Sequence, residues 1–326
     1  MGHGVSPALV TIADAGRRAG LGHLSRAGAV AVALARRDVA TRCLACGVTT
    51  GFERDGLRWE PLASLDTTVA VDAGAVLADG YTLGTDRLEE IAATVPLAVM
   101  DDSGSPPSFC SLAIDAAAED ADLPPLLGGP SYACLRPDFW DLERRLTRDE
   151  IVTILVATGG GDVGRVAEAA VTAAREVLPR ATICVVRGPY ATGSAPAGVG
   201  TLEVPVSLAC ELKRADLAVV TGGQTVLEAT CSGVPTIAIP VTENQRRTTR
   251  RLARLGAVKP VEARDVSALA ETIASLGRDH CARRALAERA RDVVDGNGAR
   301  RVADWLKRLI DGELPPRGQA APGATA

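Results

Sequence analysis

The sequence of 326 residues is poor in aromatic residues, histidine and lysine. Phe, Tyr and Trp make up only 3% of it, so its core must consist of Ala, Val, Leu and Ile, within an apolar fraction of 47%. It has three histidines, and three lysines beside 33 arginines, which we interpret as a bias of composition rather than a functional signal. The net charge of −4 is not a basic excess and disfavours a nucleic-acid-binding protein.

Long apolar runs are also missing, since none approaches the roughly 18 to 20 residues of a membrane span. The first ten residues, MGHGVSPALV, have neither the basic region nor the long apolar region of a signal peptide. We therefore expect a cytoplasmic protein without a membrane span, whose eight cysteines are reduced.

Only Cys43 and Cys46 form a C-x-x-C pair, and they lie in a segment typical of a β-strand. Residues three apart on a strand point to opposite faces, which is a poor geometry for sharing a metal ion. No second cysteine pair completes a site, so the sequence favours buried structural thiols over zinc or redox chemistry.

Short apolar runs alternate with helical patterns along the chain, which predicts parallel sheets with helices on both faces. The strands predicted in the first half are 8–14, 39–47, 73–81, 96–102 and 110–115, with helices at 23–36 and 85–94. In the second half the predicted strands are 151–158, 181–188, 200–205, 215–220 and 234–241. The predicted helices there are 163–177, 224–232, 244–255, 265–276, 280–292 and 297–311.

The charged segment 136–150 interrupts this rhythm and is predicted to be a linker with a helical turn. We therefore predict two Rossmann-like domains, over 1–145 and 146–312, that face each other across a cleft, followed by a disordered tail over 313–326. In open α/β sheets, ligands bind beyond the carboxyl ends of the strands. The residues just after each predicted strand are therefore the candidates for a site.

Three glycine-rich bends follow predicted strands: GLGHLSR (20–26), ATGGGDVG (157–164) and TGGQTVLEA (221–229). In each, glycines let the backbone approach a ligand, and the helix that follows offers free N–H groups to an anion. One such bend alone is more often a plain turn, but three of them indicate a phosphate site. None has the P-loop or the G-x-G-x-x-G pattern, which disfavours a P-loop enzyme and a dinucleotide oxidoreductase. The candidate residues in these bends are Gly22, Gly160, Gly222, Gly223 and Thr225.

The sequence resembles one family in these bends and in the segments DGYTLG (79–84), MDDSG (100–104), LLGGPSYACLRPDFW (126–140) and VPTIAIPVTENQ (234–245). The family comprises the hydrolases of pseudaminic acid biosynthesis that act on UDP-2,4-diacetamido-2,4,6-trideoxy-β-L-altropyranose, together with the spore-coat polysaccharide biosynthesis proteins. The resemblance covers roughly residues 8 to 295. It implies the GT-B fold of two facing Rossmann-like domains, a UDP-sugar substrate, and no metal or other cofactor.

The resemblance also implies roles for individual residues. His23 matches the family's general base, Tyr81 a tyrosine near the sugar, and Glu228 the acid that holds the nucleotide ribose. The bend around the diphosphate matches Gly222, Gly223 and Thr225, and the pair that faces the phosphates and the sugar matches Asn244 and Gln245. The chain departs from the family at Gln224, Asp115 and Val163, which leaves the sugar open.

The position of His23 in the sequence also favours a role as general base, independently of the family resemblance. This residue lies at the start of a predicted helix, whose positive end disfavours the imidazolium, so the ring is suited to act as a neutral base. We expect Asp14, at the end of the first strand, to orient this ring as the third member of a triad does. A turn-capping role for Asp14 is the alternative, and Arg26 would meet a phosphate or remain solvated.

The expected reaction is attack on the anomeric carbon of a UDP-linked amino sugar, with departure of UDP beside Gly223. Water as the nucleophile makes the protein a hydrolase of amino-sugar or nonulosonic acid biosynthesis, whereas a hydroxyl makes it an inverting glycosyltransferase. The first half has no basic and apolar cluster for a membrane acceptor, which favours water or a soluble acceptor. A third possibility, binding without catalysis, is disfavoured by the presence of His23, and the oligomeric state stays open.

Overall fold

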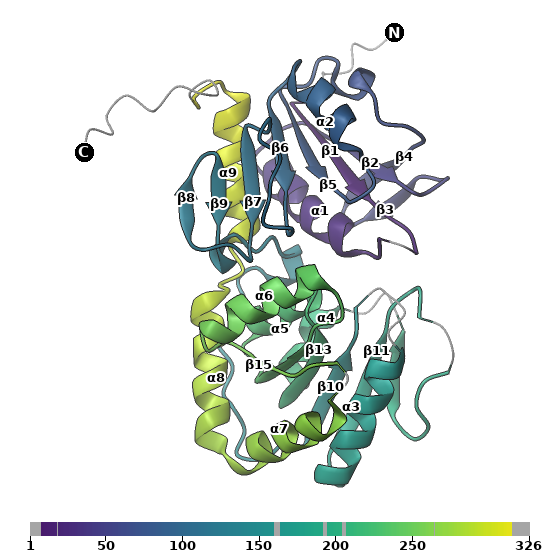
Figure 1. Cartoon of the computed structure of the whole chain (residues 1–326), viewed down its shortest axis with the longest axis vertical. Coiled ribbons are helices and arrows are strands. Elements are labelled where there is room, and N and C mark those ends of the chain that lie inside the picture. The colour runs from purple at the N-terminus through teal and green to yellow at the C-terminus, as the bar shows by residue number, and fades with distance from the viewer. Residues whose placement is uncertain are drawn as a thin grey trace, which may run out of the picture.

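The structure is a computed structural model that describes residues 8–17, 19–159, 164–191, 194–203, 207–263 and 265–314. Two α/β units lie one above the other along the long axis of the molecule (Figure 1). Each is built around a mainly parallel sheet, as the alternation of strands and helices predicts. The tail predicted over 313–326 lies outside the described residues, except for residues 313 and 314.

Within the described residues the first unit has a nine-stranded sheet with the order β3-β4-β2-β1-β5-β6-β7-β9-β8. Neighbouring strands are parallel except in two edge hairpins, β3–β4 and β8–β9. The strands are β1 (Leu9–Asp14), β2 (Thr41–Cys46), β3 (Phe52–Arg54), β4 (Leu57–Leu62), β5 (Ala75–Asp79), β6 (Leu97–Met100), β7 (Leu112–Asp115), β8 (Ala121–Leu123) and β9 (Leu126–Gly128). The α-helices of this segment are α1 (Gly22–Ala35) and α2 (Thr85–Ala92).

The second unit has a six-stranded sheet in the part of the chain that the structure describes, with the order β12-β11-β10-β13-β14-β15 and parallel neighbours throughout. Its strands are β10 (Thr153–Ala157), β11 (Thr182–Arg187), β12 (Gly200–Glu203), β13 (Leu217–Thr221), β14 (Thr236–Ile239) and β15 (Lys259–Pro260). Its helices are α3 (Gly164–Val177), α4 (Leu208–Arg214), α5 (Gln224–Ser232), α6 (Glu243–Arg254), α7 (Val266–Arg278) and α8 (His280–Val293).

Apolar residues on both faces explain why the central strands are buried between helices. In β1, Leu9 and Ala13 pack into the core beside α1, whereas Val10 and Ile12 pack into the core beside α2. All six residues of β1 are buried. Such a strand needs cover on both sides, which the crossover helices of a parallel sheet provide.

The predicted strands and helices are confirmed within the described residues, apart from shifts at their ends. The structure adds five short strands and one short α-helix that the sequence analysis does not predict, namely β3, β4, β8, β9, β15 and α4. Three of them, β3, β8 and β15, have no buried residue. They form through edge pairing of the backbone, so the hydrophobic pattern contains no signal for them.

The predicted linker, residues 136–150, has the expected helical turn at Pro137–Phe139. It is packed rather than loose. Phe139 is fully buried in the core of the second unit, and the next residue, Trp140, lies in the core of the first. The linker therefore fixes the two units to each other.

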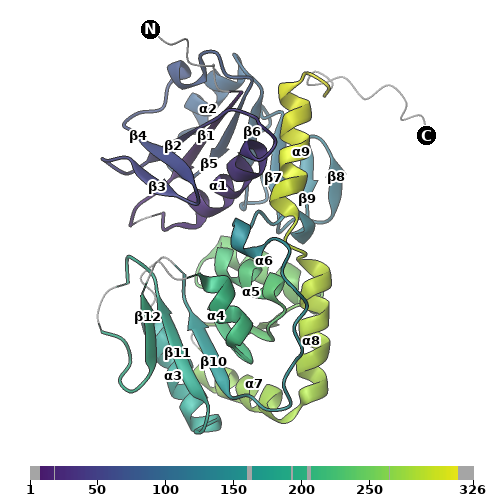
Figure 2. The ribbon, with the colours of Figure 1, turned by 180° about the vertical axis from the view of Figure 1, so that it is seen from behind.

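The structure differs from the predicted domain division at the last helix, α9 (Gly298–Ile310). We predict this segment as part of the second domain, but it lies beside α1 on the first unit (Figure 2). One face of α9 explains this return, because its apolar residues complete the first core. These residues are Ala299, Val302, Ala303, Leu306 and Leu309. The boundary at 145/146 stays a prediction.

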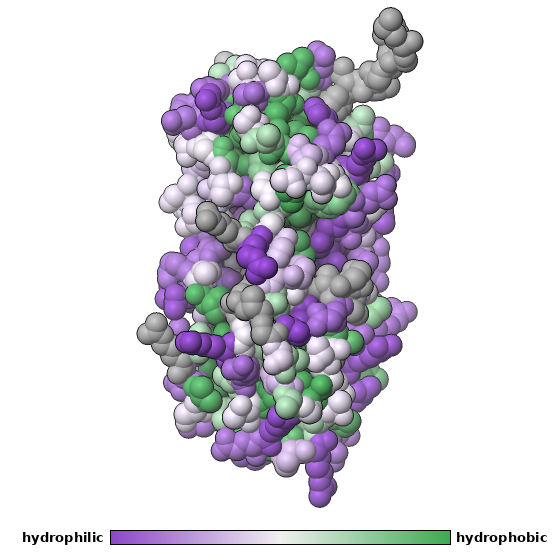
Figure 3. All heavy atoms as spheres, turned by 90° about the vertical axis from the view of Figure 1, so that its right-hand side faces the viewer, coloured by the Kyte–Doolittle hydropathy of each residue, from purple (hydrophilic) through white to green (hydrophobic). Residues whose placement is uncertain are grey.

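The surface carries both hydrophilic and hydrophobic side chains. On the face in Figure 3, hydrophilic residues line the margins and hydrophobic ones lie between them in patches. Large apolar side chains that are well exposed occur in both units and in the linker between them, at Val71, Tyr81, Leu123, Leu146, Val152 and Val266. Among the described residues, no helix has the length and apolar character needed to span a bilayer.

The return of the chain to the first unit gives a prediction at Gly298. A methyl group there would overlap the backbone of Ala133, which cannot swing aside as the tip of a side chain can. We expect Gly298→Ala to lower the free energy of unfolding by about 1–3 kcal/mol, measured by urea denaturation. The matched control is Gly164→Ala at the start of α3, where the space is open and a change below about 1 kcal/mol is expected. Equal losses in both variants would contradict this account of the junction.

Candidate active site

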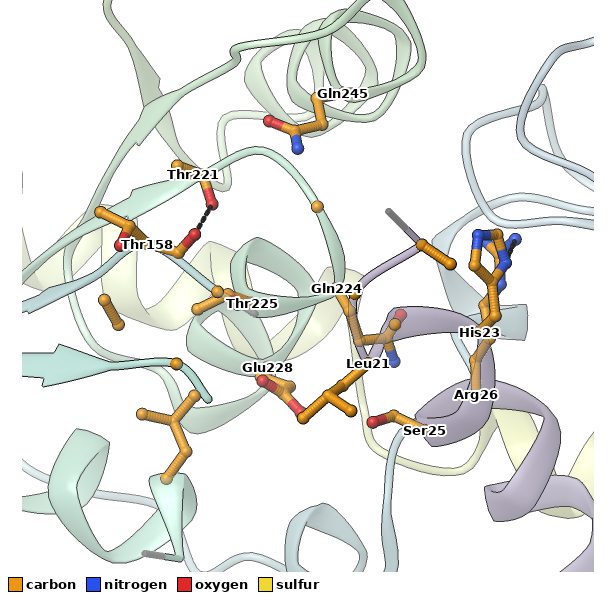
Figure 4. A pocket seen from close by; sticks show the side chains of 18 of the residues that line it. Leu21, His23, Ser25, Arg26, Thr158, Thr221, Gln224, Thr225, Glu228 and Gln245 are labelled. Carbon is orange, nitrogen blue, oxygen red and sulfur yellow. Dashed lines mark hydrogen bonds between the residues drawn. The ribbon is translucent and has the colours of Figure 1, made fainter. Parts of the chain in front are cut away.

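A cleft of about 430 Å³ lies between the two units and is lined by residues of both. It opens at the carboxyl ends of β1 and β5 from the first unit and of β10 and β13 from the second, as expected for open parallel sheets. In Figure 4, His23 and Arg26 stand on one wall, Thr158, Thr221 and Thr225 on the opposite wall, and Gln224 and Leu21 between them.

Two helices direct their N-termini into this cleft from opposite units. α1 begins after Leu21 and α5 begins after Gly223, and no side chain of the described residues caps either start. The two ends are close, because a methyl group at Gly22 would lie 3.9 Å from Cβ of Gln224. First-turn N–H groups and two positive dipole ends therefore face the same space, which suits an anion such as a diphosphate.

The glycine bend before α1 brings His23 to this place. Gly16 and Gly20 form an isolated bridge and both have positive φ angles, 97° and 72°, which favour glycine. The chain thereby turns from the end of β1 into α1, and His23, the second residue of the helix, is buried with 4% exposure while lining the cleft. The predicted position of His23 at a cleft-facing helix start is confirmed.

Asp79 is the partner of His23. Nδ1 of His23 lies 2.6 Å from Oδ1 of Asp79, which is fully buried at the end of β5. A carboxylate at this distance accepts a hydrogen bond from Nδ1–H, so the lone pair of the neutral ring lies on Nε2. No described residue hydrogen-bonds to Nε2, which leaves that atom available for a ligand in the cleft.

The expectation that Asp14 orients His23 is wrong. The Asp14 carboxylate accepts hydrogen bonds from the backbone N and the hydroxyl of Thr82, at 2.8 and 2.6 Å. It packs against Gly80, where any Cβ would approach its Cγ to 2.5 Å. Asp14 therefore holds the turn after β5, the alternative role considered for it, and through this turn supports the segment that carries Asp79 and Tyr81.

Arg26 joins the His23–Asp79 pair to a second carboxylate. Its Nε and Nη2 donate to the two oxygens of Asp79 at 2.6 and 2.7 Å, and its Nη1 donates to Asp102 at 3.2 Å. Burial works against the charged forms of both residues, but their ion pair prevails: the pKa of Asp79 is lowered and the pKa of Arg26 is raised. Arg26 is therefore paired with two carboxylates rather than solvated, and a contact with phosphate stays a prediction.

Tyr81 and Asn244 meet over His23 from opposite units. The Tyr81 ring contacts the imidazole edge-to-face with centroids 4.5 Å apart, and its hydroxyl donates to Asp102 at 2.7 Å. The Asn244 amide, at the start of α6, donates to the Tyr81 hydroxyl at 2.7 Å and to Asp102 at 3.2 Å. The predicted residues Tyr81 and Asn244 are thus brought together with His23, and all three line the cleft.

The second unit supplies the remaining predicted residues at the opposite wall. Gly223 and Thr225 line the cleft at the start of α5, and Gly222 lies directly beside them. Gln245 stabilises the turn between β14 and α6, because its Oε1 accepts a hydrogen bond from the backbone N of Val241 at 3.0 Å. Gly160, the remaining predicted residue of the phosphate site, lies outside the described residues.

Glu228 is buried in α5 and lines the cleft. Its carboxylate lies 3.5 Å from Nε of Arg136, which comes from the linker. Burial raises the pKa of Glu228, and the nearby guanidinium groups of Arg136 and Arg54 oppose that shift. Arg54 reaches the same part of the cleft from β3 and donates to Ser25 at 3.0 Å. Arg54 also pairs with Asp55 at 3.4 Å, so both guanidinium groups in this part of the cleft have a carboxylate partner.

Gln224 explains one departure from the family pattern. Where a hydroxyl side chain is expected to contact phosphate, the Gln224 amide donates to the backbone oxygen of Cys134 at 2.7 Å, across the junction of the two units. The side chain is therefore used to join the units, while the backbone of the bend remains directed at the cleft.

The sequence analysis misses Asp79, Asp102, Arg54 and Arg136. A signal for the two aspartates was present, because the neighbouring strands β1, β5, β6 and β7 all end in or are followed by aspartate, and the carboxyl ends of parallel strands share one edge. Arg54 and Arg136 lie on an edge strand and in the linker. Their approach to the cleft depends on tertiary packing that local sequence does not indicate.

No metal site is indicated by the described residues, which contain no cluster of His, Cys, Asp and Glu suited to a metal ion. Cys43 and Cys46 point into different cores, on opposite faces of the sheet, as predicted for residues three apart on a strand. The groups in the cleft are instead a base, carboxylates, guanidinium groups and two helix N-termini. These can bind a phosphate ester and move a proton.

Comparison with known proteins agrees with this geometry. No protein-family model matches the chain. The chain is 27% identical over 200 residues to the spore coat polysaccharide biosynthesis protein SpsG of Bacillus subtilis (strain 168), a match that spans 57% of this chain and 59% of SpsG. The predicted resemblance to the spore-coat polysaccharide proteins is thereby confirmed.

Solved structures identify the fold. The spinosyn rhamnosyltransferase SpnG has a TM-score of 0.64 and 15% identity, with 93% of this chain and 99% of that chain covered. The glycosyltransferase VinC in complex with dTDP has a TM-score of 0.62 and 14% identity, with 93% and 99% covered. The chain therefore has the GT-B fold, as predicted from the sequence.

The exposures of the cysteines predict their reactivity. Cys210 and Cys281 are exposed, whereas burial raises the pKa of Cys43, Cys134 and Cys231 to about 12. The thiolate is the reactive form, so at pH 8 we expect an aromatic disulfide reagent to modify Cys210 and Cys281 at once and the three buried thiols only after unfolding. A variant with both exposed residues replaced by Ser should lose the fast phase. Rapid reaction of Cys43 or Cys134 in that folded variant would contradict the burial described.

Proposed function

We propose that this GT-B chain is a nucleotide-sugar hydrolase that releases UDP from a UDP-linked acetamido-deoxy sugar by attack of water at the anomeric carbon. The observation that carries the proposal is the His23–Asp79 pair opposite the uncapped start of α5 in one cleft. A base and an anion site on facing walls are what displacement of a phosphate leaving group requires. The similarity to SpsG supports a role in the biosynthesis of sugars for a polysaccharide.

In the proposed step, the oxygen of water attacks the anomeric carbon while its proton passes to Nε2 of His23. The bond between the anomeric carbon and the diphosphate oxygen breaks, and its electron pair leaves on the diphosphate. Asp79 stabilises the imidazolium that forms, because its carboxylate accepts a hydrogen bond from Nδ1–H, with Nδ1 and Oδ1 2.6 Å apart. A single displacement inverts the anomeric configuration of the sugar that is released.

The second unit is proposed to hold the nucleotide. The N–H groups at the start of α5, after Gly223, would receive the negative charge that develops on the leaving diphosphate. Glu228 would accept hydrogen bonds from ribose hydroxyls, with Arg136 beside it balancing its charge. Uridine remains the proposed nucleoside, although the structure of VinC contains dTDP, so both diphosphates belong in the test.

An inverting glycosyltransferase with a soluble acceptor is the second candidate. Two observations favour it: the structures named above are glycosyltransferases, and Tyr81 beside His23 is 61% exposed, so the cleft is open next to the base. Both candidates use the same base and the same nucleotide site. They differ only in whether water or an acceptor hydroxyl reaches Nε2 of His23.

Release of nucleoside diphosphate distinguishes the candidates. The protein is incubated with UDP- and dTDP-linked amino sugars, with and without soluble hydroxyl acceptors, and diphosphate and sugar are followed by NMR. Release without an acceptor, with inversion at the anomeric carbon, is the result expected for the hydrolase. Release that requires an acceptor identifies a transferase, and the absence of release from every sugar nucleotide rejects both.

His23→Asn and Glu228→Ala should separate chemistry from binding. Loss of the base is expected to lower kcat by about 10²–10⁴-fold while calorimetry still detects UDP binding. Loss of Glu228 is expected to weaken UDP binding instead, by about tenfold, the effect of roughly one hydrogen bond to a charged group. Unchanged turnover in His23→Asn would remove the role assigned to this residue.

A further inference from the structure

Arg26 contacts both His23, the candidate base, and Asp79, the carboxylate that orients it. It lies three residues after His23 on α1, so both side chains project from the same face of the helix. Its guanidinium donates hydrogen bonds to both oxygens of Asp79, and Nη2 also lies 3.3 Å from Nδ1 of His23. His23, Asp79 and Arg26 therefore form one compact unit rather than a pair with a distant neighbour.

The burial of Asp79 makes this arrangement necessary. Its side chain is fully buried, and a carboxylate without a counter-charge would be strongly disfavoured there. A planar guanidinium satisfies both oxygens at once and leaves one lone pair of Oδ1 for the proton on Nδ1 of His23. A lysine has a single ammonium group and cannot hold the carboxylate plane in the same way.

The charged and titratable groups around His23 come from several elements. Asp79 ends β5, Arg26 lies on α1, Tyr81 follows β5, and Asp102 follows β6. Cys134, two residues before the linker, lies near Arg26 and Asp79. Arg247 of α6 donates to the backbone oxygen of Asp102 and to Asp115. Within this set, Arg26 is the cation that contacts Asp79 and approaches the imidazole.

We propose that Arg26 is a positioning residue for the base: it holds Asp79 so that Nδ1 of His23 is the protonated nitrogen and Nε2 faces the cleft, and its charge opposes protonation of the resting ring. An Asp79 carboxylate without this counter-charge would instead favour the doubly protonated imidazole, which has no lone pair to accept a proton. The proposal rests on the proposed function, in which His23 takes a proton from the nucleophile.

Asp102 extends this arrangement to the other unit. It accepts from Arg26, from the Tyr81 hydroxyl and from the Asn244 amide of α6. The guanidinium is thus fixed between two carboxylates. Asp79 orients the base, and Asp102 accepts a hydrogen bond from the second unit. Arg26 therefore connects the orientation of the base to the contact between the two units at the cleft.

The test follows the protonation of His23 directly and needs no substrate. The sequence has three histidines, so ¹³C-labelled imidazole groups give few NMR signals, and the one lost in His23→Gln identifies His23. In Arg26→Gln we expect the titration midpoint of His23 to move to higher pH by about one unit or more, because Asp79 loses its counter-charge. In Asp79→Asn it should move to lower pH, because the guanidinium then faces the ring alone.

The conservative variant separates charge from geometry. Arg26→Lys keeps the positive charge, so the midpoint should move less than half as far as in Arg26→Gln, while kcat falls about tenfold through lost orientation. An unchanged midpoint in folded Arg26→Gln overturns the proposal. If that variant does not fold, a midpoint in Asp79→Asn that does not fall below the wild-type value overturns it.

The two proposals fail in different ways. Absence of turnover with every sugar nucleotide rejects the proposed function, yet the titration midpoints still decide whether Arg26 controls the ring. Where turnover is found, the acidic limb of the pH profile of kcat/KM should move in the same direction as the midpoint in each variant. A purely structural role would lower activity equally at every pH and leave the limb in place.

Discussion

The buried carboxylate of Asp79 is the constraint on which the arrangement of the site depends. A fully buried charge at the end of a central strand is stable only with a counter-charge and saturated hydrogen bonds, and Arg26 and His23 supply both from one turn of α1. The glycine bend between β1 and α1 allows that turn to start directly over β5. The position of the imidazole therefore follows from satisfying a buried charge.

The cleft follows from two parallel sheets whose carboxyl ends face each other. Each sheet presents a helix start beside its strand ends, and the linker, α9 and side-chain contacts hold the two units in register. Gln224 binds the backbone of Cys134, and Arg251 of α6 pairs with Glu119 at 2.5 Å and with Asp120 at 2.7 Å. Because these contacts fix the two units against each other, residues far apart in sequence reach one small volume.

Much of the fold was predictable because its signals are local. Short apolar runs that alternate with helical patterns indicate parallel sheets with helices on both faces. Glycine bends after strands indicate where a ligand lies. The same reasoning pointed to His23 in the bend after the first strand, whereas the roles of Tyr81, Glu228 and Asn244 came from the family resemblance. That reasoning chose the wrong carboxylate for His23, since Asp14 and Asp79 both end strands and only the packing of Gly80 and Thr82 separates their roles.

The sequence by itself determined the class of architecture, the edge of each sheet that carries the site, and the kinds of chemical group available there. Only the tertiary structure decided which carboxylate orients His23, that Arg26 is tied to it, that Arg136 reaches Glu228, and that α9 returns to the first unit. The physical reason is that strand and helix periodicity is set by neighbours in the chain. Pairing of buried charges and closure of a core depend instead on groups that folding brings together from distant segments.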